Sequence, residues 1–513
     1  MKSTLRLALP LLALPLLLSR SAAATTYMMM PDRALADQSA AVVDVRIVGA
    51  DPAPIDGPPA TDYLVEVQRV LKGDLSGSTV VVRVPGGISP SGIGLKIWGA
   101  PRFAEKEEAI LFLNPSEDGT YRIVHLMLGA FHKRTSGGRA VALRDLADAH
   151  DLAAKSLAQD GVDAVRDFDL FADWVADRAA GVPNQSRYVL GSAKAKVDTL
   201  PEKFVLMTWD DNLPIRWFRF DNGQSVEWKI GASGQPGLGT EATAAAFRTA
   251  IAAWDDDAGT NVNYVYTGTT NAANGLTRSD NVNAIIFDDP FRNDSKNAVE
   301  GTFDCDSGGV IAVGGPFFSQ ATRAYKGQRY HEAVEGDIVT NDGTECLFQN
   351  NPSVAQEVFT HELGHTLGLG HSQNRDAVMF ANAHNDGRGA RLADDDRAAI
   401  AQLYGTGSTG GGGGGTGSGA TLLPPARLQG RATSRTSVSL AWRDKSTGEE
   451  GYVVEAKVNV KGAKFQPAAT LDANATATVV TGLTPGTSYV FRVRSVAGNQ
   501  ASPYAVTVVG TPR

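Results

Sequence analysis

The sequence lacks the features that mark several large classes of protein. A formal net charge of −8 and an isoelectric point near 5.6 leave no positive excess to contact phosphates, which excludes nucleic acid as a partner. Beyond residue 24, no apolar run is long enough to span a bilayer. Hydrophobic residues make up 42% of the 513 residues, which is enough for folded cores, and the length predicts several domains.

The one long apolar run lies at the start of the chain. Basic residues precede the apolar residues 7–18, and the small residues 22–24 follow, as in a secretory signal peptide that is cleaved after Ala24. A membrane anchor is the alternative, but the run is short for a bilayer and contains Pro10 and Pro15. We therefore expect a signal peptide at 1–24 and a soluble, secreted, extracellular mature protein.

Cysteine is scarce, with Cys305 and Cys346 alone in the sequence. In an oxidising compartment an isolated pair is expected to form a disulfide. Such a bond contributes roughly 3 to 4 kcal/mol in the chain-entropy view.

Histidine is also rare, yet three of the eight histidines fall within residues 361–371. His361 and His365 are four residues apart, so a helix places them on one face, one turn apart. Gly368 can end that helix and let the chain return His371 to the same point. Neutral imidazoles suit Zn²⁺, and a catalytic zinc typically takes three protein ligands. We predict one catalytic zinc ion bound by these three histidines.

Glu362 directly follows the first histidine. Zinc lowers the pKa of a bound water to about 7, and a neighbouring carboxylate can take its proton and pass it to a leaving amine. An amphipathic helix with exposed histidines is the plain alternative. Five residues at this spacing arise by chance with odds on the order of 10⁻⁴ in a chain of this length, so the catalytic interpretation is favoured.

The pattern HExxHxxGxxH is the signature of metzincin metallopeptidases, and residues 201–405 resemble the matrixin branch. Ser372 follows the third histidine, Met379 lies in a segment similar to the Met-turn, and residues 392–405 resemble the closing matrixin helix. The resemblance implies an α+β catalytic domain, in which a mixed twisted sheet carries the zinc helix. It also implies a zinc endopeptidase with Met379 beneath the metal. No tyrosine follows Met379, which argues against the astacin and serralysin branches.

The sequence departs from animal matrixins in its other metal sites. Val313 stands where a histidine for a second, structural zinc would be, so we predict no such zinc. A group of oxygen-bearing side chains could instead bind Ca²⁺, although a solvated acidic loop explains it equally well: Asp304, Asp306, Asp337, Asn341 and Asp342.

Two further signals stay unassigned. No cysteine precedes the catalytic domain, so the cysteine that blocks the zinc in many animal matrixins has no counterpart. His331 and His384 are interpreted as loop residues. His384 lies near the loop at 380–392, which is expected to determine substrate specificity. The sequence of that loop does not indicate which substrate residue it prefers.

The region before the catalytic domain divides in two. Residues 25–144 contain short β-branched runs separated by Pro- and Gly-rich turns, which predicts an all-β domain, a small barrel or a sandwich. His125 and His132 are isolated there and are expected to be structural. The domain could be a pro-segment, a folding assistant or a retained accessory. Residues 145–200 predict helices and a connector, with a processing site within 181–199.

The region after the catalytic domain begins with a Gly/Ser/Thr linker at 406–421. Residues 422–513 resemble a fibronectin type III domain, a β-sandwich in which Trp442 would lie in the core and residues 483–489 would form the tyrosine corner. Such modules either bind a partner or hold neighbouring domains apart. We expect this one to contact extracellular matrix or polysaccharide.

These signals together predict a monomeric, multidomain, secreted zinc endopeptidase. Protein or peptide substrates would lie extended along the edge strand at 309–313. An adhesion or matrix-binding protein with a vestigial zinc site is the alternative from another class. A processing protease with one cognate target is a third interpretation.

Overall fold

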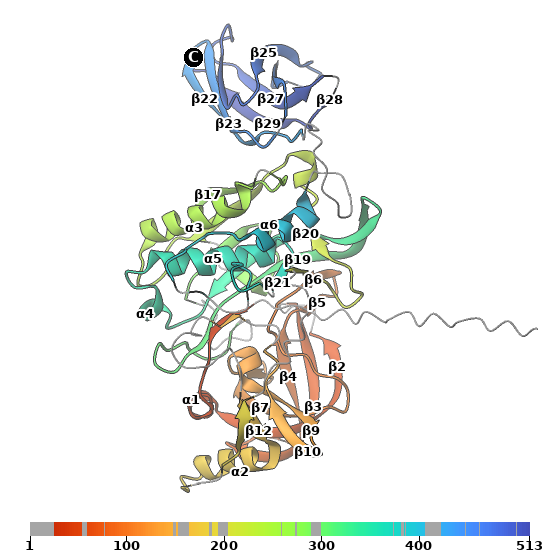
Figure 1. Cartoon of the computed structure of the whole chain (residues 1–513), viewed down its shortest axis with the longest axis vertical. Coiled ribbons are helices and arrows are strands. Elements are labelled where there is room, and N and C mark those ends of the chain that lie inside the picture. Colours follow the sequence, from red (N-terminus) through yellow and green to blue (C-terminus); the bar gives the residue numbers. More distant parts are fainter. Residues whose placement is uncertain are drawn as a thin grey trace, which may run out of the picture.

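The computed structural model describes most of the chain after residue 24, and Figure 1 shows three bodies in a row along the long axis. The described residues are 25–53, 59–75, 77–146, 150–151, 164–183, 187–192, 204–257, 259–271, 274–288, 299–372, 374–380, 384, 386–405, 422–446, 448–460, 462–498 and 500–512. The predicted signal peptide, the linker at 406–421 and much of the predicted connector lie outside them. None of the described helices combines the length and the apolar character needed to cross a membrane.

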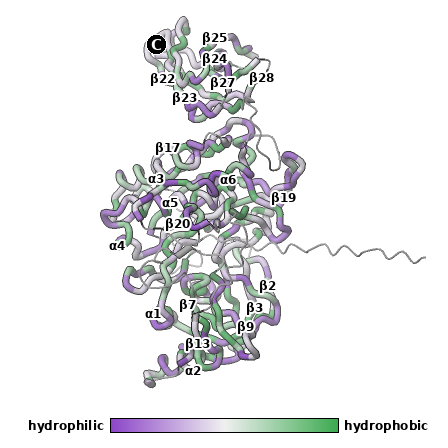
Figure 2. The backbone as a smooth tube through the Cα atoms, viewed as in Figure 1, coloured by the Kyte–Doolittle hydropathy of each residue, from purple (hydrophilic) through white to green (hydrophobic). Residues whose placement is uncertain are grey.

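The first body is built on a sheet that closes on itself, and we call it the N-terminal unit. Its strands pair in the order β13-β12-β10-β9-β7-β2-β3-β4-β8, and β7 also pairs with β8. Five strands therefore form a closed barrel: β2 (Ala41–Pro52), β3 (Ala60–Lys72), β4 (Thr79–Pro85), β7 (Glu108–Pro115) and β8 (Tyr121–Ile123). Alternating valines such as Val43 and Val45 fill it. Figure 2 shows hydrophobic residues along β7, whereas β9 (Ala130–Ser136) is hydrophobic only at its start.

The N-terminal unit is less purely β than the sequence predicts. It contains α1 (Asp32–Gln38), and a second helix, α2 (Phe168–Ala179), packs on β3. Helices were expected across 145–180, but in the described part the helix begins only at Phe168, where the Asp167 side chain accepts the Leu170 amide. The residues before it form β12 (Ala164–Asp167), which pairs with β10 (Arg139–Leu143) and β13 (Val189–Ser192). Sheet pairing therefore overrides the local helical pattern there.

The second body combines a mixed sheet with three long helices. β16 (Val226–Gly231), β17 (Tyr264–Thr270) and β18 (Asn283–Ile286) are parallel to one another and to β20 (Gln328–Thr340), whereas β19 (Gly309–Tyr325) runs antiparallel to β20. The helices are α3 (Thr240–Asp255), α5 (Pro352–Thr366) and α6 (Asp394–Tyr404). α3 packs on α5, where the Trp254 indole donates to the carbonyl of Thr360 at 2.8 Å.

The ends of α5 fix the position of the metal-binding motif. Ser353 and Gln356 have the spacing of a capping box, but the helix begins at Pro352 without a side-chain cap. Proline suits the first helical position because its missing N–H would have no partner there. Gly368 follows the last turn with φ of 91°, the left-handed conformation in which glycine ends helices.

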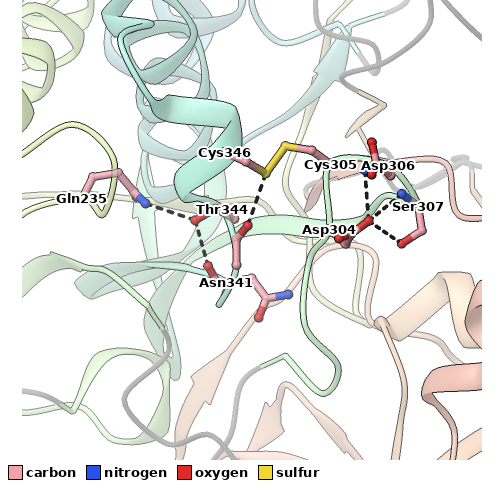
Figure 3. Close-up of a disulfide and its surroundings, with 9 residues drawn as sticks. Gln235, Asp304, Cys305, Asp306, Ser307, Asn341, Thr344 and Cys346 are labelled. Atoms are coloured by element: carbon pink, nitrogen blue, oxygen red, sulfur yellow. Dashed lines mark hydrogen bonds between the residues drawn. A yellow bond between two sulfur atoms is a disulfide. The ribbon is translucent and has the colours of Figure 1, made fainter.

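A disulfide joins Cys305 to Cys346, with Cα atoms 6.3 Å apart. As Figure 3 shows, it connects the turn at Asp304–Ser307 to the short helix α4 (Glu345–Phe348), which directly precedes α5. The loop after residue 299 is thereby tied to the region from which the motif helix starts.

The third body is a β-sandwich of two sheets. One sheet contains β22 (Ala426–Ser434), β23 (Ser437–Arg443) and β26 (Ala477–Val480). The other contains β25 (Gln466–Asp472), β24 (Gly451–Val458) and β27 (Ser488–Ala497), and β27 also pairs with β28 (Gln500–Ala501) and β29 (Ala505–Gly510). Trp442 lies in the core of the sandwich, and the hydroxyl of Tyr489 accepts the Thr484 amide at 2.9 Å, as in a tyrosine corner. Cations of this sandwich meet the acidic end of α3. Arg427 contacts Asp255 at 2.7 Å, and Lys445 donates to the carbonyl of Asp257 at 2.9 Å. These contacts offset negative charge that is unfavourable at a helix C-terminus.

Glu107 is a charged anchor of the barrel. Its carboxylate accepts from His132 at 2.8 Å, from the Ala104 amide at 2.8 Å and from Arg134 at 2.5 Å. Burial opposes ionisation, but these hydrogen bonds outweigh it and lower the pKa of Glu107 to about 2 from 4.5. His132 is thus a structural residue with a partner, as expected.

We predict that Glu107 stabilises the barrel in a pH-dependent way. A carboxyl whose folded pKa is depressed contributes its full stabilisation above the unfolded value, and loses it as pH falls from about 4.5 to about 2. Glu107→Gln should therefore cost about 2 kcal/mol at pH 6, and the difference from wild type should shrink towards zero at acid pH. Urea titrations with hydrogen exchange on peptides from β7 and β9 measure this difference. A difference that is constant from pH 6 to pH 2 would contradict it.

Candidate active site

Three histidines converge at the end of α5. His361 and His365 lie one turn apart with ring centroids at 4.5 Å, and His371 comes from β21 (Leu369–Ser372), which follows Gly368. One nitrogen from each ring lies within 4.8 Å of the others. All three side chains are buried, with at most 2% exposed.

Backbone carbonyls fix the orientation of two of these rings. Nδ1 of His361 lies 2.8 Å from the Val378 carbonyl, and Nδ1 of His365 lies 2.9 Å from the Leu369 carbonyl. A carbonyl only accepts, so each Nδ1 carries the proton and each Nε2 presents a lone pair. Burial also lowers the pKa of His361 to about 3, which keeps its ring neutral.

The donor set fits a zinc ion. Nε2 of His361 lies 2.9 Å from Nε2 of His371, and Nε2 of His365 is buried without a hydrogen-bond partner. The unpartnered lone pair on Nε2 of His365 is costly in a buried space, and a cation removes that cost. Three neutral imidazoles are the ligand set that zinc accepts with one open position.

Glu362 lies beside this cluster on the same helix and is completely buried. Its Oε1 accepts the hydroxyl of Thr26 at 2.5 Å. Burial raises the pKa of Glu362 to about 8, against hydrogen bonds from Thr26 that lower it. The carboxyl also lies against β19 at Gly314, where a Cβ atom would approach Oε2 to 2.9 Å, so glycine leaves room for it.

Met379 packs under the motif helix. Its side chain is 1% exposed, and its sulfur lies so close to Gly364 that a Cβ there would approach it to 2.3 Å. The turn that contains Met379 also supplies the Val378 carbonyl that accepts from His361. Met379 therefore lies against the ligand helix.

Asp396 is a site residue that sequence reasoning missed. Its buried carboxylate accepts the amides of Val378 and Met379 at 2.8 and 3.0 Å, and the amide of Ala393 at 2.8 Å. It thereby holds the turn whose carbonyl orients His361. Acidic residues are favourable in the first turn of any helix, so the acidic run at the start of α6 does not distinguish Asp396 from its neighbours.

The unassigned histidines are hydrogen-bonded anchors. His384 contacts Glu357 of α5 through Nδ1 at 2.8 Å and the Arg375 carbonyl through Nε2 at 2.7 Å, which ties the segment after Met379 to the motif helix. His331 is not a loop residue but part of β20, and its ring contacts Asp211 and the Ser319 carbonyl.

The oxygen-bearing side chains that suggested calcium do not converge. Asp304 accepts the Asp306 amide together with the amide and hydroxyl of Ser307, so its carboxylate is used within its own turn (Figure 3). Asp337 is buried and accepts the Ala284 amide. Among the described residues, the histidine cluster is the one group of three or more His, Cys, Asp or Glu side chains close enough to share a metal.

Comparison with known families decides the class of the second body. Residues 217–405 match the family model described as Matrixin. The chain contains a matrixin domain. Residues 423–509 match the Fibronectin type III domain, so the matrixin domain is followed by a sandwich of that family.

Similar curated proteins cover short stretches. Matrix metalloproteinase-2 of Drosophila melanogaster is 57% identical over 49 residues, which are 10% of this chain and 6% of that protein. Matrilysin of Homo sapiens is 49% identical over 47 residues, 9% of this chain and 18% of that protein. The matches thus span less than a fifth of either relative, and together with the matrixin model they support a metalloendopeptidase. A solved structure, the FN5 domain of Drosophila Lar, shares 24% identity over 18% of this chain and 96% of its own, with a TM-score of 0.16.

We predict that Gly364→Ala harms the matrixin domain. Alanine inside a helix is normally about 0.5 to 1 kcal/mol better than glycine. Here the added Cβ would lie 2.3 Å from the Met379 sulfur and 2.8 Å from Trp254, so we expect a loss of about 1 to 3 kcal/mol. Calorimetric unfolding should show a lower midpoint, and zinc titration a weaker affinity. Thr249→Ala on the exposed face of α3 is the control, and equal behaviour of the two variants would contradict the prediction.

Proposed function

We propose that this chain is a secreted zinc-dependent endopeptidase. The observation that carries the proposal is the convergence of His361, His365 and His371 in one buried cluster, with Glu362 beside it on the same helix. The match of residues 217–405 to the matrixin family supports the same reaction class.

The zinc would be held by His361, His365 and His371. His361 and His365 would bind it through Nε2, since the Nδ1 proton of each is donated to a backbone carbonyl. When bound, zinc supplies Lewis-acid activation of water and of the peptide carbonyl. Asp396 and Met379 act as positioning residues, because they fix the turn that orients His361.

Glu362 would move the proton. Glu362 directly follows the first ligand on α5, and its Oε1 would accept a proton from the attacking water and pass it to the leaving amine. In this structure Oε1 is engaged with Thr26, so the reaction requires that this hydrogen bond be broken first.

Substrates would be proteins or peptides in extended conformation. The first part of β19, at 309–313, lies next to α5, and a peptide added there as a strand would pass Glu362. The fibronectin type III domain would contact extracellular matrix or polysaccharide. The disulfide supports an oxidising compartment, and with the predicted signal peptide it supports secretion.

The test is cleavage of a broad fluorogenic peptide library by the purified protein. We measure the intact chain and a sample nicked by limited proteolysis, each with and without a zinc chelator. Glu362→Ala should bind zinc as wild type does and cleave at least about 100-fold more slowly, because the proton acceptor is missing. A zinc-bound protein that cleaves nothing, intact or nicked, would overturn the proposal.

A further inference from the structure

One strand that contacts the candidate active site does not belong to the matrixin domain. β1 (Thr25–Met28) joins the sheet antiparallel to the start of β19, pairing Thr25 with Val313, Thr26 with Ala312 and Tyr27 with Val310. This is the stretch of edge strand at which a substrate was expected. On its other side β1 pairs with β11 (His150–Asp151), so β1 is an inner strand of the sheet.

β1 also contacts the candidate catalytic group. Thr26 donates its hydroxyl to Oε1 of Glu362 at 2.5 Å, across 336 residues of sequence. The side chains of Thr25 and Thr26 are completely buried, and Thr25 donates to the carbonyl of Trp98. β1 therefore lies where an extended substrate would lie. The hydroxyl of Thr26 occupies the carboxyl of Glu362, to which a reacting water would have to give its proton.

His125 of the N-terminal unit completes this contact. The pairing of β1 with β19 has an irregularity between Thr26 and Tyr27. There Nδ1 of His125 accepts the Val310 amide at 3.2 Å, while Nε2 lies 3.1 Å from Gln38. A buried histidine thus satisfies a backbone donor of the edge strand next to this irregularity.

A second segment covers the next part of the same edge. β6 (Ile93–Leu95) pairs antiparallel with Phe317, Phe318 and Ser319 of β19. The fit is close, since a Cβ at Gly94 would lie 2.2 Å from the Phe318 ring and a Cβ at Gly315 would lie 2.2 Å from the Lys96 carbonyl.

Apolar packing joins the two bodies as well. Tyr27, Met30 and Leu95 share one buried cluster with Val310 and Phe317 of β19. The contact is therefore a hydrophobic core that continues from the N-terminal unit into the matrixin domain.

We propose that the N-terminal unit is a built-in inhibitor of the peptidase, which holds β1 in the position of a substrate strand and uses Thr26 to occupy Glu362. The inference rests on the proposed function. It needs no cysteine, and it assigns a role to the domain at 25–144, which the sequence left between pro-segment, folding assistant and accessory. Activation then means displacement of β1 from β19.

The test displaces β1 in the full chain. Thr26→Arg places a side chain much larger than threonine at a completely buried position, so β1 must leave the edge. Thr79→Arg is the matched control, because Thr79 is an exposed threonine of β4 in the same unit. Thr26→Val is a milder variant that keeps the shape and removes the hydroxyl.

Three readouts are compared at equal zinc content. Hydrogen exchange of the amides at 310–313 reports whether β1 is paired. Affinity for a peptide hydroxamate reports whether the cleft is accessible, and hydrolysis of a fluorogenic peptide reports activity. We expect Thr26→Arg to speed exchange, and to raise hydroxamate affinity and hydrolysis at least about 10-fold, which corresponds to about 1.4 kcal/mol. Thr79→Arg should match wild type.

A synthetic peptide with the sequence of residues 25–30 should inhibit Thr26→Arg competitively, and a scrambled peptide should not. Should Thr26→Arg fail to fold, the comparison of Thr26→Val with Thr79→Val decides, with an expected gain of about 3-fold for the former.

The outcomes separate the two proposals. Equal hydroxamate affinity in wild type and in a variant whose exchange shows β1 displaced would overturn the inhibitor assignment. Higher affinity without hydrolysis in any variant would uphold the occlusion of the cleft and overturn the peptidase proposal.

Discussion

The constraint on which the structure depends is the open edge of β19. An edge strand presents backbone N–H and C=O groups that need partners, and it pairs readily with any extended chain. The same property would allow a peptidase to capture a peptide and would make an uncovered enzyme indiscriminate. Here β1, β6 and His125 satisfy that edge. The barrel of the N-terminal unit is a scaffold that presents these groups in register with one strand.

The histidine cluster depends on a second set of contacts, which connects α6 to α5 through backbone amides and a backbone carbonyl. Asp396 of α6 holds the amides of Val378 and Met379. The carbonyl of Val378 then fixes the tautomer of His361. Gly364 lets α5 lie directly against Met379. Each of these residues acts on the site through its neighbour, and a change in any of them would tilt an imidazole without removing a ligand.

Local sequence signals predicted the parts that local chemistry determines. The spacing of His361 and His365 with Gly368 predicted a helix that ends and returns His371. The pairing of Cys305 with Cys346 followed from their isolation. The contact of Thr26 with Glu362 could not be predicted, because it joins residues 336 positions apart and no pattern within β1 specifies its partner. Asp396 was missed for the same reason.

The sequence separation between β1 and β19 has a consequence for the order in which the chain is made. Contacts between distant segments form late, because a long loop must close before they add stability. Synthesis runs from the N-terminus, so β1 and the barrel exist before α5 is complete. If the N-terminal unit is the inhibitor proposed above, each new cleft assembles in the presence of a strand that fits it, and no stage exists at which an uninhibited cleft waits for that strand.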